Sequence, residues 1–129
     1  MISYVRLFLF PYSVLHGFYD LCFVVCRPEQ EFYDVVVLLG VLEYLEDPIS
    51  TVKRLRMYCN EVIISYVSAK NLHSSNIKIR EGIGVKNHLT KIDLADCLRE
   101  SDLAIINDFT IWDNPNDEHL MYHLTWPPH

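Results

Sequence analysis

Glycine is scarce in this chain, which has 129 residues and four glycines: Gly17, Gly40, Gly82 and Gly84. None of them belongs to a Gly-x-Gly-x-Gly loop that follows an apolar run. Such loops let a nucleotide-type cofactor approach the backbone closely. The sequence therefore contains no recognisable glycine-rich cofactor loop.

Positive charge and long apolar runs are also scarce. The formal net charge is −6 and the sequence pI is about 5.4, which argues against nucleic acid as a partner, because phosphate contact needs clustered Lys and Arg. The densest basic cluster is Lys53, Arg54 and Arg56, interpreted as a solvated helix face. The apolar residues 1–10 are too few to span a bilayer and lack the features of a signal peptide. We expect no membrane partner.

Cysteine and histidine show no ligand spacing. The four cysteines match no common zinc pattern and do not suggest a disulfide scaffold: Cys22, Cys26, Cys59 and Cys97. His119 and His123 are four residues apart, but in an expected strand, where that spacing does not build a tight metal site. We predict reduced cysteines that mostly pack in a core, no metal, and a cytoplasmic location.

A parallel βαβ unit is the clearest pattern in the chain. Residues 33–39, YDVVVLL, form a continuous apolar run typical of a strand buried on both faces, and Gly40 ends it. Asp47 and Pro48 have the signature of a helix start, and we expect this helix to close at Asn60. Residues 62–67 then predict a second strand, which would be joined to the first by a right-handed crossover.

The second half of the chain predicts a helix and a hairpin. Residues 68–88 are a long polar connection, which indicates a lid or a binding loop. Thr90 starts a helix with Asp93 in a capping box, and we expect an apolar stripe of Ile92, Ala95 and Leu98. Strands at 103–112 and 119–126 follow with only a turn between them, so they must pair antiparallel.

This order resembles the second half of the class I S-adenosylmethionine-dependent methyltransferases, whose last strand is inserted antiparallel. Residues 32–48, FYDVVVLLGVLEYLEDP, look like the fourth strand and the turn after it, and residues 62–66 look like the fifth strand. Residues 84–90 resemble the segment before the penultimate helix. The resemblance implies an α/β, Rossmann-like three-layer fold with a mostly parallel sheet that ends in an antiparallel β-hairpin.

The amino-terminal part departs from that family. Only 31 residues precede Phe32, whereas one βαβ unit alone needs about 30. They could supply strands near 4–10 and 21–25, but not a whole cofactor half. We therefore expect a single domain, 1–129, truncated at the N-terminus: a divergent segment 1–31 and the C-terminal half of the fold at 32–126. A natural truncation, a divergent remnant and a misplaced gene start all remain open.

Carried over by position, the resemblance implies a set of site residues. Leu39, Gly40 and Val41 would bind the cofactor, S-adenosylmethionine. Glu43, Tyr44 and His88 would be catalytic, and Tyr66 and Asn87 would contact the substrate. Each has a plainer interpretation as well: a helix-start carboxylate for Glu43, packing aromatics for Tyr44 and Tyr66, and a surface loop histidine for His88.

The implied function is methyl transfer to an unknown small-molecule or saccharide acceptor, with activity of this truncated chain left open. The alternative is a non-catalytic remnant or interaction module of the same fold. In that case the exposed sheet edge near residues 35–39 would form a homo-oligomer or bind a partner, unless the N-terminal segment covers it. A nucleotide-sugar or nicotinamide enzyme is less compatible with the terminal hairpin.

Overall fold

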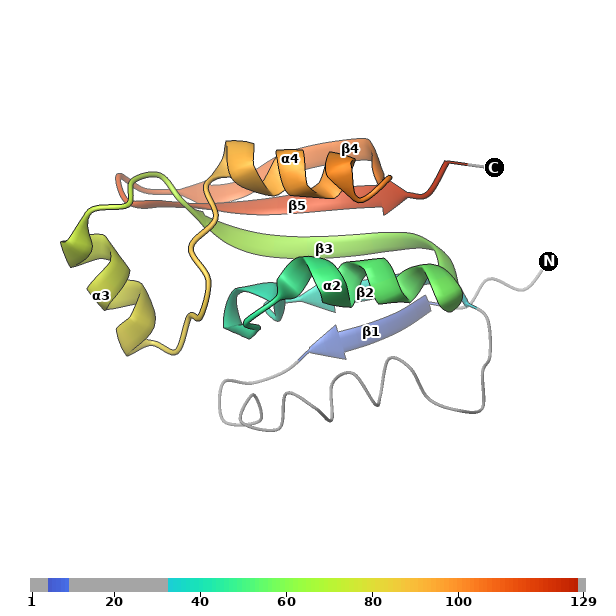
Figure 1. Ribbon diagram of the computed structural model, residues 1–129, viewed down its shortest axis with the longest axis horizontal. Helices are drawn as coiled ribbons and strands as arrows, with labels where there is room; N and C mark the ends of the chain where they lie inside the picture. The colour runs from blue at the N-terminus through green and yellow to red at the C-terminus, as the bar shows by residue number, and fades with distance from the viewer. Residues whose placement is uncertain (1–4, 10–32, 128–129) are drawn as a thin grey trace.

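Five strands form one mixed sheet in the computed structural model, which describes residues 5–9 and 33–127 (Figure 1). The strands are β1 (Val5–Leu9), β2 (Tyr33–Leu39), β3 (Cys59–Ala69), β4 (Ala104–Asp113) and β5 (Asp117–Thr125), in the spatial order β1-β2-β3-β5-β4. β1, β2 and β3 are parallel, whereas β5 pairs antiparallel with both β3 and β4. The expectation of a mostly parallel sheet is wrong, since the two antiparallel pairings are the longer ones.

The terminal hairpin and its insertion into the sheet are confirmed. β5 lies between β3 and β4, with Ile64 opposite Tyr122. Asn114 makes the turn, because its side-chain Oδ1 accepts the backbone N–H groups of Asn116 and Asp117, each at 2.8 Å. The last strand along the chain is therefore an inner strand of the sheet, with an antiparallel neighbour on each side.

The edge of β2 is paired rather than exposed. β1 runs parallel to β2, with Val5 opposite Val35 and Leu9 opposite Leu39. The sequence interpretation of residues 4–10 as a strand is thus confirmed. This strand covers the edge of β2 through which the alternative, an interaction module, was expected to bind a partner. The expected strand at 21–25, together with Cys22 and Cys26, lies outside the described residues.

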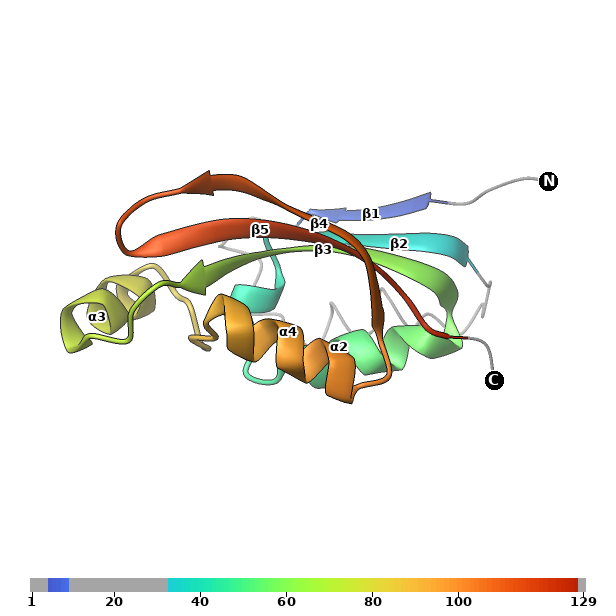
Figure 2. The same ribbon diagram turned by 90° about the horizontal axis from the view of Figure 1, so that it is seen from above.

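The helices that cover the sheet lie on one of its faces. α2 (Pro48–Arg54) and α4 (Lys91–Glu100) lie side by side there, while α3 (Ser74–Gly82) lies beyond the carboxyl end of β3 (Figure 2). The described residues also contain two 3₁₀ turns, η2 (Leu42–Tyr44) and η3 (Leu55–Met57). Among residues 5–9 and 33–127 no helix covers the opposite face, so the third layer that the sequence predicted is not seen in this part of the chain.

Helix starts follow the predicted caps. The Asp47 carboxylate accepts the Ser50 backbone N–H at 3.1 Å, with Pro48 at the first helical position. Thr90 Oγ1 accepts the Asp93 N–H at 3.2 Å. Each satisfies one of the backbone donors that a helix start leaves unpaired. α2 ends earlier than expected, because η3 tightens the last turn and Asn60 already belongs to β3.

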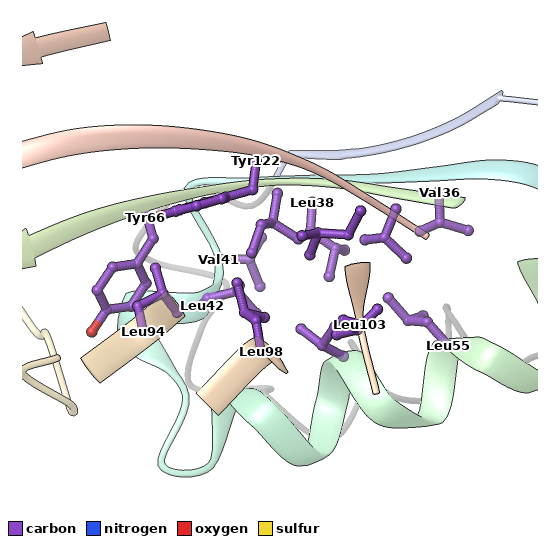
Figure 3. Close-up of a cluster of buried hydrophobic side chains, with 14 of the residues drawn as sticks. Val36, Leu38, Val41, Leu42, Leu55, Tyr66, Leu94, Leu98, Leu103 and Tyr122 are labelled. Carbon is purple, nitrogen blue, oxygen red and sulfur yellow. The ribbon is translucent and has the colours of Figure 1, made fainter. Parts of the chain in front are cut away.

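The core fills the space between the sheet and the two helices (Figure 3). Leu38, Tyr66 and Tyr122 project from the sheet and are at most 1% exposed, and they meet Leu94 and Leu98 of α4. The predicted stripe of α4 is wrong at one position. Ile92 is 73% exposed, and the buried face is formed by Leu94 and Leu98 at a spacing of four residues.

Candidate functional site

The carboxyl end of β2 turns sharply at Gly40. This residue has a φ of +65°, a conformation that L side chains rarely adopt. Its N–H donates to Ser65 Oγ at 2.8 Å, which ties the turn to β3. A Cβ placed on Gly40 would meet no heavy atom within 4 Å, so the backbone here borders open space. Leu39 beside it is half-buried, whereas the side chain of Val41 is fully buried in the core.

Glu43 lies in the η2 turn that follows, and its side chain is buried. It is 2% exposed, and its Oε1 accepts the Val67 backbone N–H at 2.9 Å. Burial raises the pKa of the Glu43 carboxyl to about 7, although the Val67 N–H and the positive charge of Arg80 act in the opposite direction. Tyr44 is half-buried, and its N–H donates to the Val41 carbonyl at 3.0 Å.

Asn87 connects this turn to the loop before α4. Its Nδ2 donates to the carbonyls of Leu42 at 2.8 Å and Leu45 at 2.7 Å. The Tyr66 hydroxyl donates to Asn87 Oδ1 and accepts the Leu89 N–H at 3.0 Å. Burial raises the pKa of Tyr66 to about 12, so the phenol stays protonated at neutral pH. The two predicted substrate contacts are thus in direct contact with each other.

Arg80 is the residue that sequence reasoning missed. It projects from α3, is 2% exposed, and its Nη1 makes an ion pair with Asp117 at 2.9 Å. Its Nη2 donates to the carbonyls of Val67 at 2.9 Å and Asn87 at 3.3 Å, and its Nε donates to His88 Nδ1 at 3.0 Å. A buried guanidinium with this many acceptors is stably held. We call Glu43, Tyr66, Arg80, Asn87 and His88 the polar network.

The one available signal for Arg80 is a spacing. Asn76 and Arg80 are four residues apart and 3% and 2% exposed, so they form the inward face of α3. Asn76 Nδ2 donates to the carbonyls of Asn71 at 3.1 Å and Asn116 at 3.3 Å. Two polar residues at helical spacing inside a polar segment give no apolar periodicity, so the pattern does not stand out in the sequence.

His88 lies at the border between the polar network and the surface. Its side chain is 20% exposed, and its Nε2 lies 3.8 Å from Glu81 Oε1. Partial burial lowers the pKa of His88, the positive charge of Arg80 lowers it further, and Glu81 opposes both. The imidazole is therefore neutral at neutral pH.

A cleft of about 640 Å³ opens beside His88. Its walls come from the chain just after η2, the end of α3 and the loop before α4, and they are Glu46, Glu81, Gly84, Val85, Lys86 and His88. Hydrogen bonds join the predicted residues to one another: Asn87 bonds to Tyr66 and to the Glu43 carbonyl, and Arg80 bonds to Asn87 and His88. Of the four predicted residues Glu43, Tyr66, Asn87 and His88, His88 lines the cleft. Below, we call it the polar cleft.

Other site types are less well supported by the described part of the chain. There, no group of three or more His, Cys, Asp and Glu side chains could hold a metal ion. No helix in residues 5–9 and 33–127 is long and apolar enough to cross a membrane. Cys59 and Cys97 are free thiols, and burial raises the pKa of Cys59 to about 12, which leaves it unreactive at neutral pH.

Comparison of the sequence with protein-family models and with curated proteins gives no match. Solved structures do match in fold. Magnesium protoporphyrin IX methyltransferase from Synechocystis PCC 6803, with bound S-adenosylhomocysteine, has a TM-score of 0.52 and 17% identity over 75% of this chain. A putative methyltransferase from Bacillus halodurans C-125 has a TM-score of 0.60 and 9% identity over 77% of this chain.

The N-terminal domain of EvdMO1, in the presence of S-adenosylhomocysteine and D-fucose, matches 97% of this chain with a TM-score of 0.56 and 10% identity. The chain spans 46% of the length of the Synechocystis protein and 66% of the length of each of the other two. Identities this low establish the fold and not the reaction. The inserted antiparallel last strand and these matches together show that the chain has the fold of the class I S-adenosylmethionine-dependent methyltransferases.

Proposed function

We propose that this chain is a methyltransferase-type domain that binds S-adenosylmethionine beside Gly40 and takes a small-molecule or saccharide methyl acceptor in the polar cleft. The observation that carries the proposal is that the open backbone at the end of β2 and the polar cleft flank the same η2 turn. Ligands of open α/β sheets bind at the carboxyl ends of the parallel strands. Structures of this fold with bound S-adenosylmethionine or S-adenosylhomocysteine support the cofactor.

The residues present fit one side of such a cofactor. Gly40 has a positive φ and open space where a side chain would be, so a ligand can approach its backbone closely. Leu39 and the backbone of Val41 would lie on either side of that contact. No glycine-rich loop exists anywhere in the sequence to hold the other side. We therefore expect weak binding, with a dissociation constant on the order of 10⁻⁴–10⁻³ M, about 4–5.5 kcal/mol of binding free energy.

Bound S-adenosylmethionine supplies an activated methyl group, so the protein has to orient the acceptor and in some cases accept its proton. Glu43 is the base that the resemblance implies, and a pKa of about 7 suits proton exchange near neutral pH. Its carboxyl is 2% exposed and bonded to the Val67 N–H, and it is not one of the walls of the polar cleft, so the acceptor would have to reach it at the η2 turn. Tyr44, on the same turn, would orient the acceptor. The presence of D-fucose in the EvdMO1 structure supports a saccharide as the acceptor class.

The cofactor part of the proposal is tested by thermal unfolding of the full chain with S-adenosylhomocysteine. At 5 mM ligand and a dissociation constant of about 0.5 mM, linkage gives about 1.4 kcal/mol of stabilisation, a rise in Tm of roughly 4–6 °C. ATP at the same concentration is the ligand control. Absence of any rise with S-adenosylhomocysteine up to 5 mM would refute cofactor binding by this chain.

A matched pair of glycine variants tests where the cofactor binds. Gly40→Ala puts a methyl group where the cofactor would approach and adds about 1–2 kcal/mol of backbone strain at positive φ. Gly82→Ala also adds a methyl group into open space, but without positive φ and away from β2. We expect the first variant to lose the Tm response and the second to keep it. Equal responses would mean that the ligand binds elsewhere.

Interaction partners remain predictions. From the net charge and the short apolar N-terminal run, we predict that the protein binds neither nucleic acid nor a membrane. From the cysteines, we predict a cytoplasmic location. A homo-oligomer also stays a prediction, with its site moved from β2, which β1 pairs, to the outer strands of the sheet.

A further inference from the structure

The bond between Arg80 and His88 determines which nitrogen of the imidazole carries the proton. Arg80 Nε–H donates to His88 Nδ1 at 3.0 Å. An arginine is a donor only, so Nδ1 must be the accepting, unprotonated nitrogen. In a neutral imidazole the proton then resides on Nε2. Protonating Nδ1 as well would set two N–H groups against each other and cost the Arg80 contact.

Arg80 is held firmly enough to impose this state. Its ion pair with Asp117 and its bonds to the Val67 and Asn87 carbonyls fix the guanidinium from β5, β3 and the loop before α4. At 2% exposure, its guanidinium is shielded from bulk solvent. His88 lines the polar cleft, and its Nε2–H lies on the side of the ring away from Arg80, with Glu81 Oε1 at 3.8 Å beyond hydrogen-bond distance.

The charges around the polar cleft restrict the chemical class of the ligand that it can bind. Glu46 and Glu81 contribute two carboxylates and Lys86 contributes one ammonium group, while His88 is neutral. The lining thus has a formal charge of −1 on a chain of net charge −6. An anionic ligand would be repelled, whereas hydroxyl and amino groups would find both donors and acceptors.

We infer that Arg80 fixes His88 as a neutral Nε2–H donor to the ligand of the polar cleft, and that this ligand is a hydroxylated small molecule without negative charge. The inference rests on the proposed function for the identity of the ligand as a methyl acceptor. It changes the expected role of His88, because the only basic lone pair of the ring is occupied by Arg80. His88 binds the acceptor and Arg80 is its positioning residue.

The first experiment observes the tautomer directly. Long-range ¹H–¹⁵N correlation spectra of the imidazole distinguish Nε2–H from Nδ1–H in the ¹⁵N-labelled full chain at pH 7.5. We expect a single Nε2–H form for His88 in the wild type and a mixture of the two tautomers in Arg80→Lys, which keeps the charge near Asp117 but lacks the Nε donor. An Nδ1–H form in the wild type would overturn the role assigned to Arg80.

The second experiment uses three sugars of the same ring and different charge: glucosamine, glucose and glucose 6-phosphate, each at 20 mM. We expect amide shifts at residues 84–88 with glucosamine, smaller shifts with glucose, and none with glucose 6-phosphate. A larger response to glucose 6-phosphate, or no response to any of the three, would overturn the ligand class.

A pair of His88 variants then separates a donor from a base. In His88→Gln the amide oxygen can accept from Arg80 and the amide N–H₂ can donate to the cleft, so the glucosamine response should persist. His88→Met offers neither, and its response should fall at least fivefold. Loss in both variants would refute the donor role. Thermal shifts with S-adenosylhomocysteine, measured on the same samples, report on the proposed function independently, so failure of one is not failure of the other.

Discussion

Replacing Glu43 by Gln should remove a pH dependence that is built into the fold. The carboxyl is 2% exposed, and its pKa is raised from an ordinary value of 4.5 to about 7, mainly by burial. The folded state therefore binds a proton more tightly than the unfolded state between these two values. Because stability falls with pH wherever the folded state binds more protons, the wild type should lose stability as pH rises from about 4.5 to about 7.

The magnitude follows from the two pKa values. One pKa unit corresponds to about 1.4 kcal/mol, so the interval from 4.5 to about 7 gives a loss of roughly 3 kcal/mol from this group. Below about pH 4.5 both states are protonated, and above about pH 7 both are ionised, so the contribution is flat on either side. The amide that Glu43→Gln introduces is neutral throughout, and its oxygen would still accept the Val67 N–H.

Urea unfolding of the wild type and of Glu43→Gln at several pH values between about 4.5 and 8.5 measures this contribution. Other groups titrate in both proteins and cancel in the difference. We expect the stability of the variant relative to the wild type to increase by about 3 kcal/mol from pH 4.5 to pH 8 and then to stay level. Parallel curves over the whole range would show that Glu43 titrates normally, and the burial argument would then fail.

Further substitutions test the fold and the polar network by urea unfolding at pH 7.5. Asn87→Ala removes the bonds that join η2 to Tyr66 and should cost about 2–4 kcal/mol; a cost under about 1 kcal/mol would contradict the network. Thr90→Ala removes the cap of α4 and should lower the free energy of unfolding by about 1 kcal/mol; an unchanged free energy of unfolding would show that the cap does not stabilise the fold. Leu98→Ala should cost about 2–5 kcal/mol, whereas Ile92→Ala, on the exposed side of the same helix, should stay within about 0.5 kcal/mol, and the reverse order would restore the stripe expected from sequence.

Local signals account for the parts of the fold that the sequence predicts. The valine run at 33–39 forms a strand because it is apolar on both faces, and Gly40 ends it with a positive φ. Asp47-Pro48 and Thr90 start helices because they satisfy free backbone donors. The Asn114 turn closes a hairpin because no helix fits between the last two strands. Each of these depends on residues close together in the chain.

α3 was missed because its inward face is polar. Its buried residues are Asn76 and Arg80, while Leu72 before it, Ile79 within it and Ile83 after it are 55–63% exposed. An amphipathic pattern with charge inside and apolar groups outside has no hydrophobic stripe to detect. The bonds that favour this orientation come from Asp117 and Asn116, which are far along the chain, so they cannot be read from the segment itself.

For the site residues too, the sequence indicates positions, whereas their interactions become visible only in the structure. Glu43, Tyr66, Asn87 and His88 were named from a family resemblance, and the structure does bring them together. The pKa values of Glu43 and Tyr66 are set mainly by burial, and the hydrogen-bond role of His88 depends on Arg80, which no motif indicated. A resemblance transfers positions along a chain, whereas the donor or acceptor character of a side chain is determined by partners that only the fold brings together.

The polar network also determines whether ligand binding in the polar cleft depends on cofactor binding beside Gly40. Asn87 and Arg80 tie η2, β3, β5 and the loop before α4 together with bonds made entirely within the described chain. The walls of the polar cleft are therefore preorganised without a cofactor, which lowers the ordering cost of binding there. The contact at Gly40, in contrast, supplies only one side of a cofactor site. Glucosamine should consequently perturb residues 84–88 equally well with and without S-adenosylhomocysteine, and a strict requirement for the cofactor would mean that the cleft is completed only when the cofactor is bound.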